Sequence, residues 1–515
     1  MPQPKHPLIA ACAVALAAVF FGSGGCGSGN GSHFGNVDGG STNYGGITGG
    51  DFDGTFAGDG PGSTPQCSGT IGWQCAVDTS CSTASPTTLT GKVFDPAGLN
   101  PLYDVVVFIP KVVASLPQIA PGTHTCNTCD TSIGDYVVAT TTNYAGEFSL
   151  PGVPTGANVP VTVQIGKWRR TVSVSIPSSC TTTAVADGTL RLPAKQSEGD
   201  MPQMAVLTGG CDDLGCFMKG MGIDASEFTA PHAGGRLDVY QGEGMGGGGG
   251  LLGGGGGAGE AASLSNGTAG NCTNASCPLW ASKASFESYD IVLLSCECAE
   301  NRQTKPAVGQ QALHDWLDEG GKVFASHYQY TWFEDSPDAD FKGVANWGNT
   351  GNNDTAQVAA GAGNPYDVDT SFPKGAVFAQ WLGVVNALNS AGPPPDILLN
   401  PVADSVVSVN APTLRWIYAS KGAPDVKYMS FGTPIGGAPP PPDAGESGTQ
   451  YCGKAVYTDL HTAGSLESTV ASIPAGCTEK TLSDQQKALE FLFFDLSACV
   501  SNNMGMAAGP PPPTQ

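Results

Sequence analysis

Between residues 88 and 193, short runs of β-branched and other apolar residues alternate with turns rich in Gly, Pro and Asn. Runs of this kind predict β-strands, because branched side chains fit a pleated sheet while Gly and Pro favour turns. We expect strands at 89–94, 105–109, 136–142, 159–165 and 171–176. About seven short strands in a hundred residues are typical of a β-sandwich, which we assign to residues 87–195.

A different pattern begins near residue 200, where apolar runs become nearly continuous. A run such as 291–294 suits a strand that is buried on both faces of a parallel sheet. We expect strands at 203–208, 236–240, 289–295, 322–326, 426–431 and 454–458, with helices between them. The predicted fold class is therefore multidomain, an all-β sandwich followed by an α/β parallel-sheet domain over residues 200–501.

Two of the predicted helices carry clear signals. The first begins near Pro306 and ends before Gly320, because Pro suits the first turn of a helix and Gly suits its end. Its apolar face comprises Val308, Ala312, Leu313, Trp316 and Leu317. The second begins with a capping box at residues 483–486, and its apolar face comprises Leu489, Leu492, Phe493 and Leu496. Both faces should pack in the core.

Low-complexity segments lie around these domains. Residues 26–66 are rich in Gly, Ser, Asn and Asp, which predicts a flexible tether, and residues 67–86 form a Cys-rich segment. Residues 242–270 begin with long glycine runs, which cannot offset the entropy lost on ordering. We therefore predict a disordered insertion there and a Pro-rich extended tail at 502–515.

Composition restricts the possible partners. The chain has 515 residues, of which 13% are charged, and its formal net charge is −23. An acidic balance argues against nucleic acid and anionic membrane surfaces as partners, because both repel negative charge. The low share of charged residues, together with 73 Gly and 39 Pro, suits an extracellular chain with low-complexity connectors.

The N-terminus predicts export. Lys5 and His6 precede an apolar run at 8–21 that is too short to span a membrane, and small residues follow at 22–25. Residues 1–25 are therefore predicted to be a signal peptide. Cys26, directly after the small residues, resembles the lipidated Cys of the bacterial lipobox. The resemblance implies membrane anchoring through lipid at the cell envelope or surface, and simple secretion is the alternative.

Seventeen cysteines fit an oxidising compartment, where disulfides are expected. Eight of them lie in close pairs along the sequence. These disulfide candidates are Cys126, Cys129, Cys211, Cys216, Cys272, Cys277, Cys296 and Cys298. Because Cys12 leaves with the signal and Cys26 would carry lipid, an odd number remains, which predicts at least one free thiol or an intermolecular bridge.

Two family resemblances refine the domain assignment. The sequences LTGKVFD at 89–95, DVVVF at 104–108 and TNYAGEF at 142–148 resemble the carboxypeptidase regulatory-like domain. That family has a transthyretin-like β-sandwich and is appended to many secreted proteins. The resemblance implies a structural or binding module without chemistry of its own.

The sequences YDIVL at 289–293, LDEGGKVF at 317–324 and GKAVYTDLH at 453–461 resemble the class I glutamine-amidotransferase-like superfamily, in particular its ThuA-like branch. The resemblance implies a flavodoxin-like sheet. Amidotransferases place a nucleophilic Cys directly after the strand that ends here at Ser326, where this chain has His327. Glutaminase chemistry is therefore not expected.

Candidate functional residues follow the predicted strands of the α/β domain. In open parallel sheets, ligands bind beyond the carboxyl ends of the strands. The candidate catalytic residues at that edge are Glu297, His327, Asp459 and His461, which could ligate a divalent metal and activate water. Alternatively, aromatic residues beside His327 could form a shelf for a sugar ring; the shelf candidates are Tyr328, Tyr330 and Trp332. In a third interpretation all of these residues are structural.

The order of segments, with GKWRR at 166–170, QSEGD at 196–200 and FASH at 324–327, resembles a group of secreted proteins abundant in myxobacteria. We expect a cell-surface lipoprotein whose α/β domain binds a glycan or a surface protein, with no nucleic acid partner and no cofactor. Binding is favoured over catalysis. The alternative is a metal-assisted hydrolase of a carbohydrate or an amide, with a divalent metal at the edge formed by His327 and His461.

Overall fold

The computed structural model describes residues 69–123, 126, 133–243, 261–262, 264, 266–348, 364–422, 424–437, 450–462, 472–478, 480–498, 500 and 505. All of them belong to one compact unit, Gly60–Gln515. The predicted signal peptide, Cys26 and the tether lie outside the described residues, as do residues 244–260 and most of the tail. Within the described ranges, no helix is long and apolar enough to cross a membrane.

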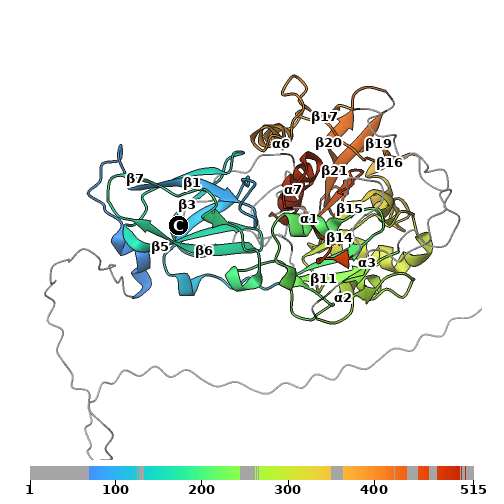
Figure 1. Ribbon diagram of the computed structural model, residues 1–515, viewed down its shortest axis with the longest axis horizontal. Helices are drawn as coiled ribbons and strands as arrows, with labels where there is room; N and C mark the ends of the chain where they lie inside the picture. The colour runs from blue at the N-terminus through green and yellow to red at the C-terminus, as the bar shows by residue number, and fades with distance from the viewer. Residues whose placement is uncertain are drawn as a thin grey trace, which may run out of the picture. The chain divides into compact units, whose positions relative to one another are not determined.

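The N-terminal part of this unit contains two four-stranded sheets (Figure 1). One has the order β4-β1-β7, with β8 also paired to β1, and the other has the order β3-β2-β5-β6. Their strands are β1 (Thr88–Phe94), β2 (Val106–Pro110), β3 (Tyr136–Thr141), β4 (Glu147–Pro151), β5 (Gly156–Ile165), β6 (Trp168–Ile176), β7 (Thr182–Ala184) and β8 (Leu190–Arg191). In β4, Phe148 and Leu150 are buried while their neighbours are exposed, the alternation expected of a sheet that covers a core. The five strands predicted here are all present.

The rest of the unit is built around one eleven-stranded sheet, in the order β10-β11-β9-β14-β15-β22-β21-β20-β17-β18, with β13 also paired to β11. Its strands are β9 (Met204–Thr208), β10 (Phe228–Thr229), β11 (Leu237–Gln241), β13 (Gly270–Asn271), β14 (Ile291–Leu294), β15 (Lys322–Ser326), β17 (Tyr366–Val368), β18 (Asp396–Ile397), β20 (Leu414–Ala419), β21 (Asp425–Thr433) and β22 (Gly453–Thr458). The six predicted strands all belong to this sheet. Gly270, the last residue of the predicted disordered insertion, instead begins β13.

Only one half of this sheet is parallel. From β10 to β22, neighbouring strands run parallel. From β22 to β18, they run antiparallel. The sequence predicted a parallel sheet, and the difference has a simple cause in the connections. Residues 420–424 alone link β20 to β21, and so short a link can join only antiparallel neighbours.

The remaining elements are short or lie on the faces of the sheet. The α-helices of the described residues are α1 (Leu214–Gly220), α2 (Lys283–Phe286), α3 (Ala307–Asp318), α4 (Thr331–Glu334), α5 (Ala339–Lys342), α6 (Pro373–Val384) and α7 (Asp484–Ser497). Turns of 3-10 helix are Gly69–Ala76, Val113–Ser115, Gln196–Glu198, Ala225–Glu227, Pro278–Trp280, Arg302–Thr304 and His327–Tyr330. Two small sheets pair β12 (Ala261–Ala262) with β23 (Ser472–Ile473) and β16 (Ala345–Trp347) with β19 (Val406–Val409).

Both predicted helices are confirmed. Helix α3 begins directly after Pro306, and its predicted apolar face is buried except for Val308, which is 62% exposed. Val308 lies in the first turn, and the sequence analysis was wrong to include it in the core face. Helix α7 begins with the predicted capping box, in which the Ser483 side chain accepts from the Gln486 N–H and the Gln486 side chain accepts from the Ser483 N–H.

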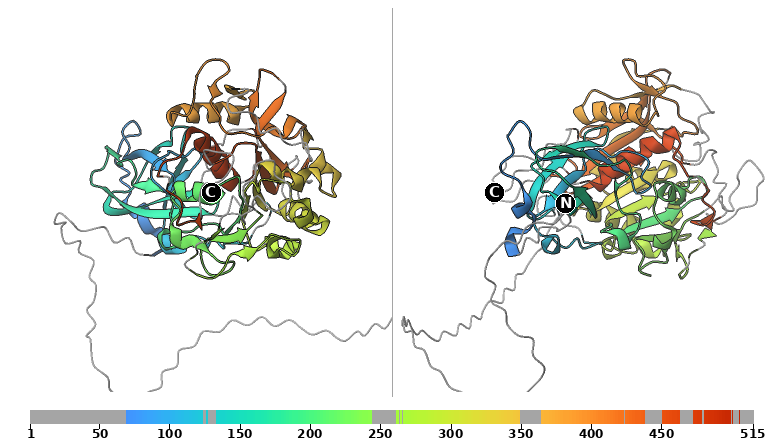
Figure 2. Two further views of the ribbon diagram at one scale, coloured as in Figure 1. Left: turned by 45° about the vertical axis from the view of Figure 1, so that its right-hand side comes forward. Right: turned by 60° about the vertical axis from the view of Figure 1, so that its left-hand side comes forward.

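Helix α7 lies between the large sheet and the N-terminal sheets (Figures 1 and 2). The ring of Trp168 in β6 meets Phe493 and Phe494 edge-on, at centroid distances of 6.5 and 6.1 Å. Asn100 donates a hydrogen bond of 2.6 Å from Nδ2 to Glu490 Oε2. Both parts of the unit contribute residues to one hydrophobic core cluster, so they are packed together rather than joined only by a linker.

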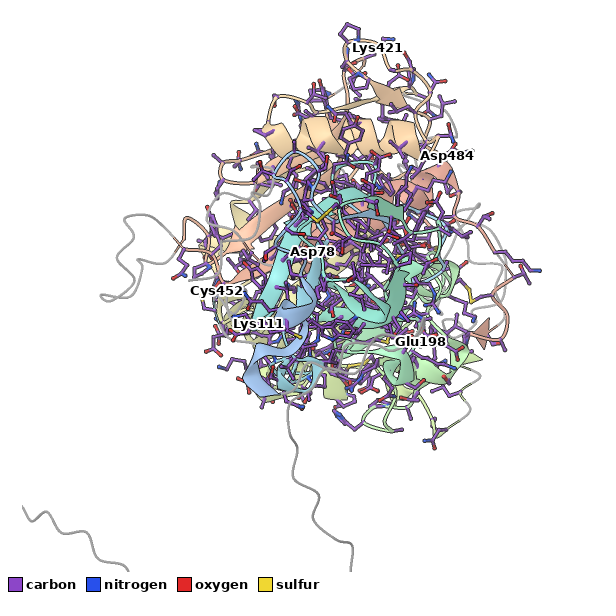
Figure 3. All side chains as sticks on the ribbon, turned by 90° about the vertical axis from the view of Figure 1, so that its left-hand side faces the viewer. Asp78, Lys111, Glu198, Lys421, Cys452 and Asp484 are labelled. Carbon is purple, nitrogen blue, oxygen red and sulfur yellow. A yellow bond between two sulfur atoms is a disulfide. The ribbon has the colours of Figure 1, made fainter. Side chains whose placement is uncertain are left out.

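Disulfides also connect distant segments. The bonds between described cysteines are Cys81–Cys180, Cys126–Cys452, Cys211–Cys298, Cys216–Cys477 and Cys272–Cys277. Cys452, labelled in Figure 3, precedes β22 and lies 326 residues from Cys126. Several disulfides in one chain are typical of an extracellular or exported protein.

Most of the predicted close pairs are not bonded to each other. Only Cys272 and Cys277 are, and Cys129 lies outside the described residues. Cys298 pairs with Cys211, which leaves Cys296 as the free thiol among the described cysteines. Cys296 is therefore not a disulfide partner, which corrects its inclusion among the candidates. It is a free thiol, one of the two outcomes that the odd cysteine count predicted.

Candidate functional site

The carboxyl ends of the parallel strands meet at one edge of the sheet. Leu294 of β14 lies opposite Ala325 of β15, and Ser326 lies opposite Thr458 of β22. The residues that directly follow these strands are therefore neighbours. The structure brings His327 and His461 together, with His461 Nε2 at 3.1 Å from His327 Nδ1, and adds Cys296, whose Sγ lies 3.3 Å from the same nitrogen. We call Cys296, His327 and His461 the buried centre.

His327 occupies an unusual backbone position. It directly follows β15 with φ at 42°, in the left-handed region that only a few non-glycine residues adopt. This turn starts the 3-10 helix His327–Tyr330 and is held by Tyr457, whose hydroxyl donates to the His327 carbonyl at 2.8 Å. Burial, together with the proximity of His461, lowers the pKa of His327 to about 3. The imidazole is therefore neutral at pH 7, the form that binds metals.

The orientation of His461 is set by its other nitrogen. His461 Nδ1 lies 2.8 Å from the Cys211 carbonyl oxygen, which can only accept a hydrogen bond. Nδ1 therefore carries the proton, and Nε2 presents its lone pair toward His327 and Cys296. Metal-binding histidines are fixed in this way by a hydrogen bond from the second ring nitrogen.

Cys296 is fully buried. Burial raises the pKa of its thiol, and the negative charge of Asp212 raises it further. A thiol in such surroundings is a poor nucleophile at neutral pH, because the thiolate is the reactive form. A metal ion would bind the same sulfur by displacing its proton. The surroundings of Cys296 thus favour a ligand over a nucleophile.

Asp212 ties the loops of the buried centre together. It follows β9, is fully buried and accepts hydrogen bonds from the Thr462 N–H at 2.7 Å, the Asp213 N–H at 3.0 Å and the hydroxyls of Thr462 and Ser326. Ser326 precedes His327 and Thr462 follows His461. This carboxylate therefore fixes the position of both histidines. Asp212 was not among the candidate catalytic residues predicted at this edge.

The other two predicted catalytic residues are bonded elsewhere. Glu297 forms an ion pair of 2.7 Å with Lys305, in which neither side chain is exposed, and it also accepts from the Glu243 N–H at 2.8 Å. Asp459 accepts from the Ser405 N–H at 2.8 Å and from the Ser405 hydroxyl at 3.0 Å. Both carboxylates support the loops around the buried centre. The side chain that joins the two histidines as a possible ligand is Cys296, and not Glu297 or Asp459 as predicted.

The predicted sugar-binding shelf lies in the interior. Tyr330 and Trp332 are 0% exposed and Tyr328 is 8% exposed. Trp332 packs edge-on against Trp280 with the ring centroids 5.2 Å apart. Rings that are enclosed in this way cannot stack on a sugar from solution. The shelf assignment is therefore corrected, because the short helices that follow β15 fold these aromatic side chains back onto the sheet.

The buried centre fits a transition-metal ion such as Zn²⁺. One ligand atom from each of its residues lies within 4.8 Å of the others. Bonds of about 2.0 Å to nitrogen and 2.3 Å to sulfur at tetrahedral angles would place these atoms roughly 3.3–3.6 Å apart. The observed 3.1 and 3.3 Å are close to that spacing. One thiol and two imidazoles form a donor set that zinc and similar ions prefer.

Comparison of the chain with protein-family models, with curated proteins and with solved structures gives no match. The chemistry of the buried centre must therefore be argued from its own geometry.

Proposed function

We propose that the protein is an exported hydrolase that uses a divalent metal held by Cys296, His327 and His461, acting on an amide or a carbohydrate. One observation carries this proposal: the thiol and both imidazoles converge at the strand ends, with His461 Nε2 and Cys296 Sγ at 3.1 and 3.3 Å from His327 Nδ1. Bonding to the Cys211 carbonyl leaves His461 Nε2 available as a ligand.

The number of ligands favours a catalytic metal over a structural one. Structural zinc sites are closed by four protein ligands, whereas catalytic sites use three and leave the fourth position for water or substrate. The described residues provide three at the buried centre. A bound zinc ion would lower the pKa of that water and so supply a nucleophile at neutral pH.

The surrounding residues keep the ligands in place. Asp212 holds the loops that carry the two histidines, through its bonds to Ser326 and Thr462. Lys305 neutralises Glu297, so this carboxylate does not compete as a ligand. The ligands are 0–1% exposed, so a metal ion here would lie in a low-dielectric interior that strengthens its electrostatic interactions.

Elemental analysis of the purified full-length mature protein tests the proposal. We expect zinc in the wild type and one zinc per chain less in Cys296→Ser and His461→Ala. The control His232→Ala should keep the wild-type content, because the His232 side chain is 66% exposed and lies outside the centre. The cobalt-substituted protein should absorb in the near ultraviolet through a sulfur–metal bond that Cys296→Ser removes.

Chromogenic amide and glycoside substrates form the second stage of the test. Hydrolysis should require the metal and disappear in both ligand variants, while near-ultraviolet circular dichroism confirms that they are folded. A folded wild-type protein that binds no metal at Cys296 would overturn the proposal. So would a metal whose removal unfolds the protein while hydrolysis is absent, because that result identifies a structural ion.

A second candidate function is glycan binding without catalysis, at a place other than the predicted shelf. A hollow of about 420 Å³ lies over β19, β20 and β21, lined by Asp369, Arg415 and Tyr418 among others. The Arg415 guanidinium lies 3.5 Å above the Tyr418 ring. Charged and aromatic groups of this kind can bind sugar hydroxyls and ring faces. Glycan arrays with the wild type and Tyr418→Ala test this candidate; binding that the variant retains would exclude the hollow.

We also propose that lipid on Cys26 anchors the protein at the cell envelope. The support is the signal-like sequence before Cys26 and the several disulfides typical of exported proteins. In cells that process lipoproteins, Cys26→Ser should move the protein from the membrane fraction to the soluble fraction. Unchanged partitioning of that variant would contradict the anchor.

A further inference from the structure

A second group of possible metal ligands lies where α3 faces α5, away from the strand ends. His314 and Asp318 are one turn apart on α3, so they share one face of that helix. Asp338 and Asp340 lie at the start of α5. The ring of His314 packs on Phe341 of α5 at a centroid distance of 4.4 Å, which fixes its position between the two helices.

Carboxylate oxygens surround one nitrogen of His314. Its Nδ1 lies 3.5 Å from Asp315 Oδ1, 3.5 Å from Asp338 Oδ2 and 3.9 Å from Asp318 Oδ2. The other nitrogen, Nε2, lies 3.3 Å from Asp340 Oδ2. We call His314, Asp315, Asp318 and Asp338 the His314 cluster.

The cluster contains buried polar atoms that make no hydrogen bond. These atoms are His314 Nδ1, Asp318 Oδ1 and Asp338 Oδ2. His314 is only 9% exposed, so water cannot easily replace the missing partner of Nδ1. Buried polar groups are nearly always paired, and an unpaired one indicates an absent ion or water. His314 Nδ1 and Asp338 Oδ2 lie 3.5 Å apart, so an ion between them would give both atoms a partner.

Asp340 has a different role in this arrangement. A hydrogen bond from His314 Nε2 to Asp340 would keep the proton on Nε2 and leave the lone pair on Nδ1. Carboxylate–histidine pairs of this type orient the histidines of metal sites and make them more basic. Asp340 is therefore a positioning residue, comparable to the Cys211 carbonyl beside His461.

We propose that the His314 cluster binds a divalent transition-metal ion such as Mn²⁺ or Zn²⁺. Bonds of about 2.1 Å would place each carboxylate oxygen roughly 3.0–3.5 Å from Nδ1, slightly closer than the observed 3.5–3.9 Å. The side chains of Asp315, Asp318 and Asp338 are 27–47% exposed and free to make that small adjustment. A nitrogen donor among carboxylates favours Mn²⁺ or Zn²⁺ over Ca²⁺ and Mg²⁺, which prefer oxygen alone.

The ion would fasten α3 to α5. Phe341 of α5 also packs on Phe333 and Phe431 in the aromatic core, at centroid distances of 6.0 and 5.7 Å. The proposed site therefore connects a cluster near the surface, through Phe341, to the aromatic core. That core lies below the short helices that follow the buried centre in sequence. It does not depend on the proposed hydrolase activity, because no residue is shared between the two sites.

The competing explanation is that a protonated His314 balances the carboxylates without any metal. Manganese titration of the full-length mature protein separates the two explanations, since Mn²⁺ is a hard ion that binds thiolate poorly. We expect one Mn²⁺ per chain by electron paramagnetic resonance. Affinity should fall at least tenfold in His314→Gln and in Asp338→Asn, and stay unchanged in Cys296→Ser and in Asp187→Asn, which alters an exposed carboxylate elsewhere.

Thermal unfolding of the same variants shows whether a loss of Mn²⁺ binding comes from the missing ligand or from a folding defect. Added Mn²⁺ should raise the melting temperature of the wild type and of Cys296→Ser, and leave that of folded His314→Gln unchanged. The proposal is overturned if the wild type binds no Mn²⁺. It is also overturned if both cluster variants bind Mn²⁺ as tightly as the wild type does.

Discussion

The buried centre and the His314 cluster use the same kind of residue in opposite surroundings. In the buried centre, both histidines and Cys296 are at most 1% exposed, and no carboxylate is among the ligands. In the His314 cluster, one histidine meets three carboxylates whose side chains are 27–47% exposed. Carboxylate ligands are thus found only where water still reaches them.

The cost of removing charge from water explains this difference. An isolated carboxylate is strongly destabilised in the protein interior, whereas a neutral imidazole or thiol is not. Near the buried centre, the chain therefore neutralises Glu297 with Lys305 and surrounds Asp212 with hydrogen-bond donors. The His314 cluster has only His314 itself to balance three carboxylates, so we expect an ion to supply the rest. Four experiments would break or sharpen this contrast.

The largest effect is expected from Asp212→Ala. The change leaves two N–H groups and two hydroxyls without their acceptor, which should lower the free energy of unfolding by about 5 kcal/mol. Urea unfolding measures the loss. Metal at the buried centre should disappear while Mn²⁺ binding at the His314 cluster survives in the folded fraction. Asp212→Asn, which keeps one accepting oxygen, should lose less; equal losses would show that the charge itself is required.

Lys305→Met should cost about 3–4 kcal/mol, because it leaves the buried Glu297 charged and without its cation. Adding Glu297→Gln to the same chain should recover most of that loss, since no charge is then buried. Chemical denaturation of the single and double variants gives the coupling. A stable single variant would mean that a metal ion, and not the lysine, neutralises Glu297.

Asp95 and Glu490 form a pair of buried carboxyl groups at the contact between α7 and the N-terminal sheets. Burial raises the pKa of Asp95 to about 6, and burial together with the charge of Asp95 raises the pKa of Glu490 well above its usual value. The folded state thus favours the protonated forms, so the contribution of this pair to stability is fully present below about pH 4 and is lost as the pH rises toward 6 and beyond.

Replacing Glu490 tests whether the stabilising contribution of this pair falls as the pH rises. Glu490→Gln should stabilise the protein at pH 7 by about 2 kcal/mol and flatten the decline between pH 4 and pH 7. Denaturant midpoints measured across that range provide the comparison with the wild type. If the decline keeps its original slope, the pair is not the group that titrates.

The smallest effect concerns the positioning residue of the His314 cluster. Asp340→Asn should weaken Mn²⁺ binding about tenfold, because the histidine becomes less basic and less firmly oriented. Its stability without metal should stay close to that of the wild type, since the side chain is 40% exposed. An affinity loss as large as that of His314→Gln would instead make Asp340 a direct ligand.

The strands and the two main helices could be predicted because their signals are local. Branched runs such as 159–165, the Pro306 start of α3 and the capping box of α7 each specify a structure within a few residues. The meeting of His327 and His461 was also predictable, because parallel strands end at one edge. The rule that the carboxyl ends of parallel strands form a binding edge was enough to place the two histidines together.

Other features depend on contacts that no local pattern encodes. Cys296 was assigned to a disulfide because it lies two residues from Cys298, whereas Cys298 bonds to Cys211, 87 residues away in sequence. Tyr330 and Trp332 resemble an exposed shelf in sequence, but the helices after β15 turn them inward. A useful signal was present, since the odd cysteine count predicted a free thiol or an intermolecular bridge and Cys296 follows a strand of the parallel sheet.

The disulfides have a further consequence for a protein outside the cell. Cys126 bonds to Cys452 and Cys216 bonds to Cys477, so both bridges span most of the α/β part. A protease that cuts anywhere between residues 216 and 452 would leave two fragments joined by at least these two disulfides. The cut protein would migrate as one species until a reductant separated it. Cleavage in this long stretch would therefore not release either fragment into the surroundings.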